Sequence, residues 1–337
     1  MPFIKYFMLT GVLPVFLLFF IGLYIQPVSG DLTRLGNLSE RDFGWNAMQH
    51  QLTIKESLQT RQPKVVVIGD SFSVRNIWQS IAADDASLTF MTFDWGVFSN
   101  NTDCLEQWLS ALKDAYPNCK FVVIETIERD FLGRFNSKDK TCDTKSKRPV
   151  IVQQGHTDSV RSFDMRDAMP DPIYAVKSIY NSLHAFKKIE KKKDVFVAPL
   201  TRTGLFSNKR SDLILYYEND TLKKDWEKEE VREAVSKAGR MQHLAADKGM
   251  TLIIAVVPDK STTYASYFKY PQFAAPPPDI WAELNSQRVN QVDLRQVLLQ
   301  AVDSNQDLYL PNDTHLGSAG YVLVAKAISD RLKVFDP

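Results

Sequence analysis

The chain has 337 residues, of which 44% are hydrophobic and 24% are charged, and its formal net charge is +1. This composition excludes a disordered or collagen-like chain, and the near-neutral charge removes the simplest argument for a partner made of nucleic acid. The length accommodates one large core, or one core with a substantial insertion.

The chain begins with an apolar segment. Residues 6–25 carry no charge, and as a helix they span roughly 30 Å, the thickness of the hydrocarbon core of a bilayer. Pro14 near the middle is compatible with a membrane helix. We expect residues 1–30 to form an uncleaved signal anchor with a transmembrane helix; a signal peptide cleaved near residues 28–30 and a buried core helix are the alternatives. Lys5 precedes the span, which favours a domain outside the cytoplasm.

Apolar runs separated by amphipathic segments follow the anchor. Strands are predicted at residues 64–69, 88–95, 120–126, 251–257 and 289–294. Helices are predicted at residues 72–82, 103–115, 224–247, 262–268, 280–288 and 317–332. Because strands and helices alternate, the sequence predicts an α/β fold with a parallel sheet and helices on both of its faces.

Two regions depart from this alternation. Residues 31–62 are predicted to be a linker and N-terminal extension with one short helix near residues 45–52. Within the domain at residues 63–337, residues 130–225 are predicted to be an insertion that shapes the substrate surface. It contains one amphipathic helix at residues 173–186, a basic run at 187–193, and a hairpin at 194–200 and 213–217. The basic run is interpreted as a solvated helix end; attraction to an anionic polymer or membrane surface is the alternative.

Ser71 lies at the junction between the first predicted strand and the first predicted helix after the anchor, in the tetrapeptide Gly69-Asp70-Ser71-Phe72. A serine at this place projects from the carboxyl edge of the sheet, where backbone N–H groups favour a developing oxyanion. An ordinary helix-capping serine is the alternative for this tetrapeptide on its own.

Asp313 and His315 lie in a polar loop just before the last helix. In an extended loop, side chains two residues apart point the same way, so Asp313 would orient one imidazole nitrogen while the other faces Ser71. A serine hydroxyl needs such a base at neutral pH. The two motifs together predict a catalytic triad of Ser71, Asp313 and His315.

This order of motifs resembles the SGNH-hydrolase superfamily, whose first block is Gly-Asp-Ser and whose last block carries Asp and His. The Asp-Thr-His of this chain is similar to the alginate-type polysaccharide O-acetyltransferases, with Leu316 in place of the usual Trp. Three further segments resemble that subgroup: residues 30–34, the group Glu125, Glu128 and Arg129, and residues 257–260.

The resemblance implies an SGNH-like, flavodoxin-like sheet and a set of auxiliary site residues. Oxyanion donors are expected from the Ser71 and Gly96 N–H groups, with Asn100 or Asn101 replacing an asparagine that the family carries after the third strand. Glu125, Glu128, Arg129 and Lys260 are expected near the active edge, where they bind substrate, position the catalytic loops or form structural ion pairs.

The three cysteines are Cys104, Cys119 and Cys142. Cys104 opens a helix and Cys142 follows the third strand, so both are expected at the active edge, whereas Cys119 belongs at the opposite edge. If a disulfide forms, we expect it to join Cys104 to Cys142. No CxxC pair is present, so the sequence indicates no zinc or redox motif.

The triad predicts acyl transfer through an acyl-serine, without metal or soluble cofactor, and the resemblance implies that the acyl group is acetyl and the acceptor a polysaccharide. The resemblance implies a membrane-bound acyltransferase as the partner that supplies acetyl. The expected location is the inner membrane, with a single span and the catalytic domain in the periplasm. A carbohydrate esterase, a D-alanyl transferase of similar architecture and a non-catalytic glycan-binding scaffold are the alternatives.

Overall fold

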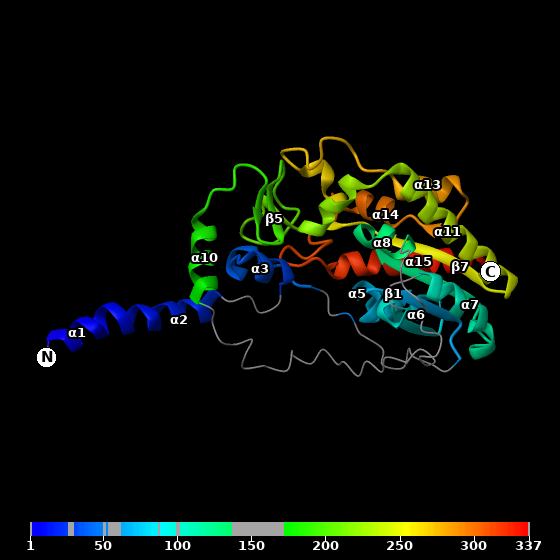
Figure 1. Cartoon of the computed structure of the whole chain (residues 1–337), viewed down its shortest axis with the longest axis horizontal. Coiled ribbons are helices and arrows are strands. Elements are labelled where there is room, and N and C mark those ends of the chain that lie inside the picture. The colour runs from blue at the N-terminus through cyan, green and yellow to red at the C-terminus, as the bar shows by residue number, and fades with distance from the viewer. Residues whose placement is uncertain are drawn as a thin grey trace.

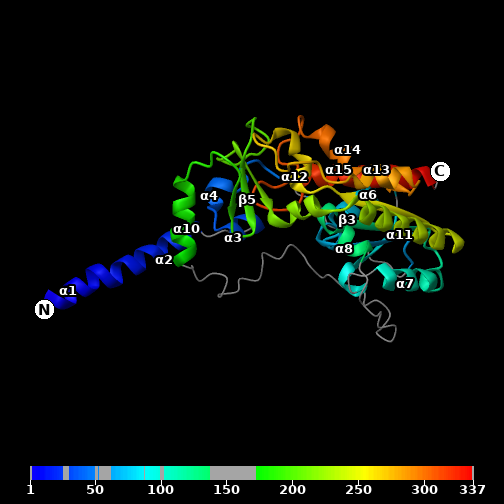
Figure 2. The same ribbon diagram turned by 45° about the horizontal axis from the view of Figure 1, so that its top comes forward.

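The computed structural model describes residues 2–25, 30–49, 52, 62–86, 88–98, 102–136 and 172–335. Figure 1 shows an N-terminal helix that projects from a domain in which helices enclose a parallel sheet. A smaller antiparallel sheet lies between the parallel sheet and the N-terminal helix, as the turned view in Figure 2 also shows.

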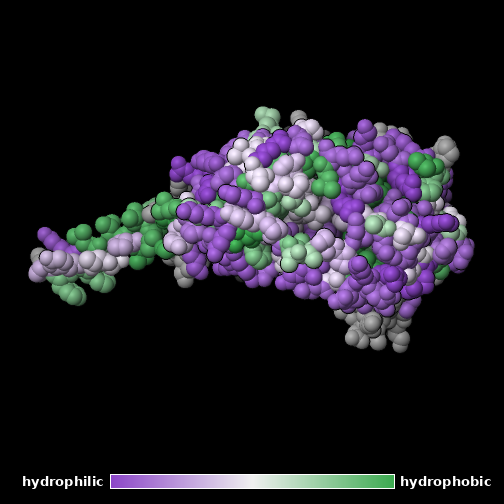
Figure 3. Space-filling model, turned by 90° about the horizontal axis from the view of Figure 1, so that it is seen from above, coloured by the Kyte–Doolittle hydropathy of each residue, from purple (hydrophilic) through white to green (hydrophobic). Residues whose placement is uncertain are grey.

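The N-terminal helix is continuous from α1 (Pro2–Phe7) through a π-helical turn, η1 (Met8–Val12), into α2 (Leu13–Ile25). The π-helical turn ends two residues before Pro14, whose ring would collide with a carbonyl of a regular α-helix and which lacks an N–H group. Its segment Pro2–Phe20 is long and apolar enough to cross a membrane. Figure 3 shows its apolar side chains gathered along the projecting helix. This finding agrees with the predicted anchor.

The parallel sheet has the order β2-β1-β3-β7-β8. Its strands are β1 (Val65–Gly69), β2 (Phe90–Asp94), β3 (Phe121–Ile127), β7 (Thr251–Val257) and β8 (Gln291–Val292). In chain order within this sheet, the arrangement is 2-1-3-4-5, which is the flavodoxin-like order. The crevice for a ligand in such a sheet lies at the carboxyl ends of the strands where the order reverses, here between β1 and β3.

Alternate strand residues pack under two helical layers, so every strand is buried on both faces. Val65 and Val67 face the layer formed by α6 (Ile77–Ala86), α14 (Leu294–Ala301) and α15 (Ser318–Phe335). Val66 and Ile68 face the layer formed by α7 (Thr102–Ala115), α11 (Lys228–Asp247) and α13 (Ile280–Ser286). The predicted α/β fold is therefore confirmed.

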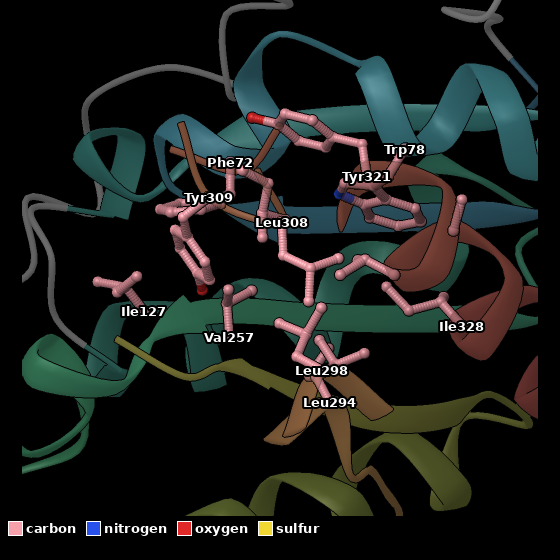
Figure 4. Packing of buried hydrophobic residues seen from close by; sticks show 14 of the residues in the cluster. Phe72, Trp78, Ile127, Val257, Leu294, Leu298, Leu308, Tyr309, Tyr321 and Ile328 are labelled. Carbon is pink, nitrogen blue, oxygen red and sulfur yellow. The ribbon is translucent and has the colours of Figure 1, made fainter. Parts of the chain in front are cut away.

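The first of these two cores reaches the carboxyl edge of the sheet. Figure 4 shows part of it, in which Phe72 from the helix after β1, and Leu308 and Tyr309 from the loop before α15, join the cluster of strand and helix residues. Buried side chains therefore hold both the segment after β1 and the loop before α15 in place, so that this edge of the sheet is rigid.

The smaller sheet consists of β4 (Glu190–Lys192), β5 (Val195–Pro199) and β6 (Leu213–Tyr217), all antiparallel. One of its faces covers α3 (Asp31–Gly36) and α4 (Glu40–Phe43), and α10 (Pro172–Leu183) packs beside them. The shared core contains Leu32, Leu38 and Phe43 from the N-terminal extension and Val195 and Val197 from β5.

Several predicted elements differ from the structure. Residues 45–49 are not helical, whereas the preceding residues form α3 and α4. The basic run at 187–193 contains β4 rather than a helix end, because Lys192 pairs with Val195 across a tight turn. The helix predicted at 72–82 is split by Asn76, whose φ is 56°, into α5 (Ser71–Val74) and α6. The helix α14 was not predicted, although Asp293 caps it by accepting a hydrogen bond from the Gln296 N–H at 2.9 Å.

Six short helices complete the description of these residues. They are η3 (Trp95–Phe98), η4 (Glu128–Asp130) followed by α8 (Phe131–Phe135), η5 (Glu218–Asp225), α12 (Lys260–Thr263) and η6 (Ala265–Tyr267). η4, α12 and η5 follow β3, β7 and β6 respectively, so most of them begin at strand ends.

Candidate active site

Ser71 is the first residue of α5, directly after β1, and its side chain is exposed. The preceding Asp70 caps this helix, because its Oδ1 accepts the Phe72 N–H at 3.1 Å. A Cβ atom at Gly69 would lie 2.5 Å from the Ser73 side chain and 2.6 Å from Glu125 Oε2, so only glycine fits this approach. Among the described residues the Ser71 N–H has no hydrogen-bond acceptor, so it remains free to bind an oxyanion.

Glu125 stabilises the turn between β1 and α5. Its Oε2 accepts hydrogen bonds from the Asp70 N–H at 3.1 Å and from the Ser73 hydroxyl at 2.7 Å. Burial, reinforced by the negative charge of Asp70, raises the pKa of Glu125 well above its usual value. Burial at this place therefore favours the neutral form of the carboxyl. Asp70 in turn accepts the Ile127 N–H at 2.9 Å, which ties the end of β1 to the end of β3.

His315 joins Ser71 to Asp313. Its Nε2 lies 2.9 Å from Ser71 Oγ, and its Nδ1 lies 2.7 Å from Asp313 Oδ1. The same Asp313 oxygen accepts the His315 backbone N–H at 2.9 Å, which is why a spacing of two residues suffices. Burial alone would raise the pKa of Asp313, but the hydrogen bonds and charge of His315 lower it to about 2. Asp313 is thus a permanent acceptor for the imidazole, as in a Ser-His-Asp triad.

Lys260 holds the loop that carries Asp313 and His315. Its buried ammonium donates to three backbone carbonyls: Leu310 at 2.7 Å, Pro311 at 2.9 Å and Asp313 at 3.2 Å. Burial lowers the pKa of Lys260 to about 7, despite the opposing effect of the Asp313 carboxylate. The side chain therefore acts on the loop backbone from inside the protein and does not face solvent.

The segment that follows the N-terminal helix holds the same loop from another side. The Leu32 N–H donates to the Asn312 carbonyl at 2.9 Å, and the Asp31 N–H donates to Asp313 Oδ2 at 3.4 Å. A Cβ at Gly30 would lie 2.6 Å from the Asn312 carbonyl oxygen, so Gly30 permits this contact. The Asp31 carboxylate also lies 3.9 Å from His315 Nδ1. The motif at residues 30–34 was predicted only as a family resemblance, and its contact with the triad was missed.

Asp31, Asp313 and His315 are also the one group among the described residues that brings three possible metal ligands within 4.8 Å of one another. His315 Nδ1 and Asp313 are already committed to each other at 2.7 Å. A metal ion here would break that hydrogen bond, so the donor set fits proton transfer better than metal binding.

A buried ionic cluster lies behind the site, at the ends of β3 and β7. Arg129 contacts Asp259 at 2.8 Å and Asp220 at 3.1 Å, and Lys223 contacts Glu128 and Asp259, both at 2.9 Å. Burial raises the pKa of Asp220 to about 7. The cluster joins η5 to both strand ends. Asp220 and Lys223 were not predicted, because no local pattern marks them, and Asp259 was included only as part of the resemblance at residues 257–260.

These contacts locate the four auxiliary residues of the sequence prediction. Glu125, Glu128 and Lys260 are buried, and the Arg129 side chain is only 13% exposed. Their partners are the protein groups named above, so in this structure they position the strand ends and loops instead of facing a substrate.

The auxiliary oxyanion donors have a different outcome. The Gly96 N–H donates to Asp94 Oδ1 at 2.6 Å, so that hydrogen bond competes with a role in the oxyanion hole. Asn100 and Asn101 lie outside the described residues, as do Cys142 and the side chain of Cys104, so these predictions stay open. Cys119 is buried with a free thiol, and burial raises its pKa to about 11.

Residues 212–335 match the family described as the SGNH hydrolase-like domain of the acetyltransferase AlgX. The matched region contains Asp313, His315 and Lys260, together with β7, β8 and α15. No curated protein matches the chain. The family match and the sheet order confirm the resemblance to the SGNH superfamily and its alginate-type acetyltransferases.

Proposed function

We propose, from the family match and from the contact between Ser71 and His315, that the protein transfers an acetyl group to a hydroxyl of a polysaccharide. The observation that carries this proposal is the continuous chain of hydrogen bonds from Ser71 Oγ through His315 to Asp313. Ser71 is exposed, so a substrate can reach the nucleophile, while most of His315 and Asp313 is buried behind it.

The first half of the reaction forms an acyl-serine. His315 Nε2 takes the proton of the Ser71 hydroxyl as Oγ attacks the acyl carbon, and Asp313 stabilises the resulting imidazolium. The carbonyl oxygen becomes an oxyanion that the Ser71 N–H is placed to bind. Collapse of this intermediate breaks the bond to the donor, and His315 returns the proton to the leaving group.

The second half consumes the acyl-serine. A hydroxyl of the polysaccharide gives its proton to His315 Nε2 and attacks the acyl carbon, and Ser71 Oγ leaves and recovers the proton. An esterase uses the same residues with water as the acceptor. For a millimolar acceptor to compete with water, the site must favour it by about 10⁴ to 10⁵-fold, roughly 5–7 kcal/mol, which is within the range that good positioning can supply.

The proposal includes a location and a partner. The N-terminal helix would serve as a single-pass inner-membrane anchor with the domain in the periplasm. Coenzyme A is not normally present there, so a membrane-bound acyltransferase would supply the acetyl group, and the anchor would keep the two proteins together.

Two measurements test the proposal. A fluorophosphonate should label the wild-type serine and fail to label Ser71→Ala, whereas Ser304→Ala, which changes an exposed serine after α14, should label normally. Equal labelling of Ser71→Ala would indicate a non-catalytic scaffold. Hydrolysis of an acetyl ester should then fall as oligosaccharide acceptors are added and acetylated. Hydrolysis that no glycan acceptor reduces would favour the esterase.

A further inference from the structure

One face of α10 is fixed to the N-terminal extension. The Tyr174 hydroxyl donates to the Leu38 carbonyl at 2.6 Å. Ser178 Oγ and Asn181 Nδ2 both donate to the Asn37 carbonyl, at 3.2 Å and 3.0 Å. All three side chains are buried, so this polar face belongs to the fold and sets the rotation of the helix about its axis.

The opposite face of α10 is apolar and exposed. Val176, Tyr180 and Leu183 are 50%, 63% and 83% exposed. Their spacing of four and three residues places them in one stripe along the helix. α10 also buries the apolar Tyr174 and Ala175, but a helix that exposes three large apolar side chains on its opposite face departs from the pattern of a surface helix in water. The stripe therefore indicates an apolar surrounding on that side.

The position of α10 beside the N-terminal helix indicates what this apolar surrounding is. α10 packs against α2, the second half of the apolar N-terminal helix. Figures 1 and 2 both show α10 at the end of the domain nearest to α2, running across the direction of the N-terminal helix. If the N-terminal helix crosses a bilayer, a helix in this orientation lies along the membrane surface, with the stripe turned away from the domain.

Charge on the neighbouring segment fits the same surface. Lys177 on α10 is exposed, and so are Lys187 and Lys188 in the basic run that follows. Lys191 and Lys193 are exposed as well, but they also contact Glu218 and Asn37 of the protein. Lysines beside an apolar helical face are typical of helices that lie in the headgroup region of anionic membranes.

We propose that α10 is an interfacial helix: Val176, Tyr180 and Leu183 insert among the lipids of the membrane that the N-terminal helix spans, and the basic run contacts anionic headgroups. The inference rests on the proposed membrane span and not on the proposed chemistry. With a span and a surface helix both attached, the domain has a fixed orientation to the bilayer.

Photo-crosslinking in the full-length protein tests this orientation. p-Benzoyl-phenylalanine would replace Tyr180, Leu17 in α2 or Leu299 in α14, each in protein reconstituted into vesicles of phosphatidylethanolamine and phosphatidylglycerol. Leu299 is a matched control because it is 41% exposed on a helix far from α2 in both views. Lipid adducts are expected at positions 17 and 180 and not at 299.

Each other outcome is decisive. An adduct at position 17 without one at 180 would overturn the interfacial helix while leaving the span intact. Adducts at neither position would overturn both. A crosslink from position 180 to a protein would assign the stripe to a partner or a second copy instead. Replacing phosphatidylglycerol with phosphatidylcholine should lower the adduct yield at 180, and an unchanged yield would remove the basic run from the proposal.

Discussion

The carboxylate of Asp31 lies 3.9 Å from His315 Nδ1, although 284 residues separate them in sequence. Asp31 also donates its backbone N–H to Asp313 at 3.4 Å, so it contacts both buried members of the triad. Two carboxylates therefore lie near Nδ1 of the imidazole: Asp313 accepts a hydrogen bond from it, and Asp31 acts on it through its negative charge.

Asp31→Asn should lower the rate and shift its pH dependence. Removing a negative charge at 3.9 Å takes away about 1 kcal/mol of imidazolium stabilisation at high effective dielectric, since Asp31 is partly exposed. The acid limb of the pH–rate profile should then move to lower pH by about half to one unit. Arg34→Gln removes the exposed partner of Asp31 and keeps its carboxylate, so a shift of equal size and sign in that variant would contradict the explanation.

Asp313→Asn should reduce kcat/KM for acetyl ester hydrolysis by about 10³ to 10⁴-fold, because an amide no longer fixes the imidazole tautomer. Asp330→Asn, on the exposed side of α15, is the control and should retain full activity. An Asp313→Asn variant that keeps more than a tenth of the wild-type rate would indicate that Asp31 or another group orients His315.

The pKa of Asp313 also predicts a dependence of stability on pH. Its folded pKa is about 2, below the ordinary value of 3.8, so the unfolded chain binds this proton first as the pH falls. The contribution of Asp313 to stability is thus complete above about pH 4 and is lost as the pH falls through about 2. Urea unfolding should show the stability gap between wild type and Asp313→Asn closing over this window. A gap that does not change with pH would contradict the assigned pKa.

Lys260→Met should lower kcat by about 10 to 100-fold with little effect on KM, because the loop that carries the triad loses its three donor contacts. Lys326→Met on the exposed face of α15 is the control. The folded pKa of Lys260 is about 7 against an ordinary 10.5. Between these values the unfolded state binds more protons, so Lys260 makes stability rise with pH, by up to about 1.4 kcal/mol per unit.

The Lys260→Met variant should lack that rise when unfolding is measured between pH 7 and pH 10. A parallel pH dependence in wild type and variant would show that the buried ammonium keeps an ordinary pKa. A drop in kcat with unchanged thermal stability would separate loop positioning from a general loss of folding.

Glu125→Gln and Glu125→Ala should differ sharply. Because burial favours the neutral form of the Glu125 carboxyl, the amide of Gln should replace it with a change in unfolding free energy within about 1 kcal/mol. Alanine leaves the Asp70 N–H and the Ser73 hydroxyl without their acceptor and creates a cavity, so about 3 kcal/mol should be lost. Denaturant unfolding measures both, and equal losses would show that Glu125 is ionised in the folded state.

The sequence predicted the parallel sheet because its strands are continuous apolar runs, as in β1 and β3. It also predicted which side chains converge. Ser71 follows the carboxyl end of β1, and His315 lies in the loop that precedes α15 at the same edge of the sheet. In a parallel sheet, loops at this edge lie close together however far apart they are in sequence. The 2.9 Å contact between their side chains follows from that topology.

The remaining features depend on long-range contacts that leave no local pattern. β4 forms in a lysine-rich run because β5 offers it a pairing edge, and its composition alone favours a solvated segment. The ionic cluster of Lys223 and Asp259 combines residues 36 positions apart. Asp31 was visible as part of a motif, but its place beside His315 depends on how the N-terminal extension packs.

The packing of the N-terminal extension limits how far the chain can be truncated from its N-terminus. Leu32, Leu38 and Phe43 are wholly buried under the small sheet, and the Leu32 N–H holds the Asn312 carbonyl. A soluble version of the enzyme should therefore begin before Gly30. Removing all residues before β1, by proteolysis or by shortening the gene, would expose the apolar face of the small sheet and remove a hydrogen bond from the loop that carries His315. The remaining protein would aggregate and have low activity, even though all three triad residues are present.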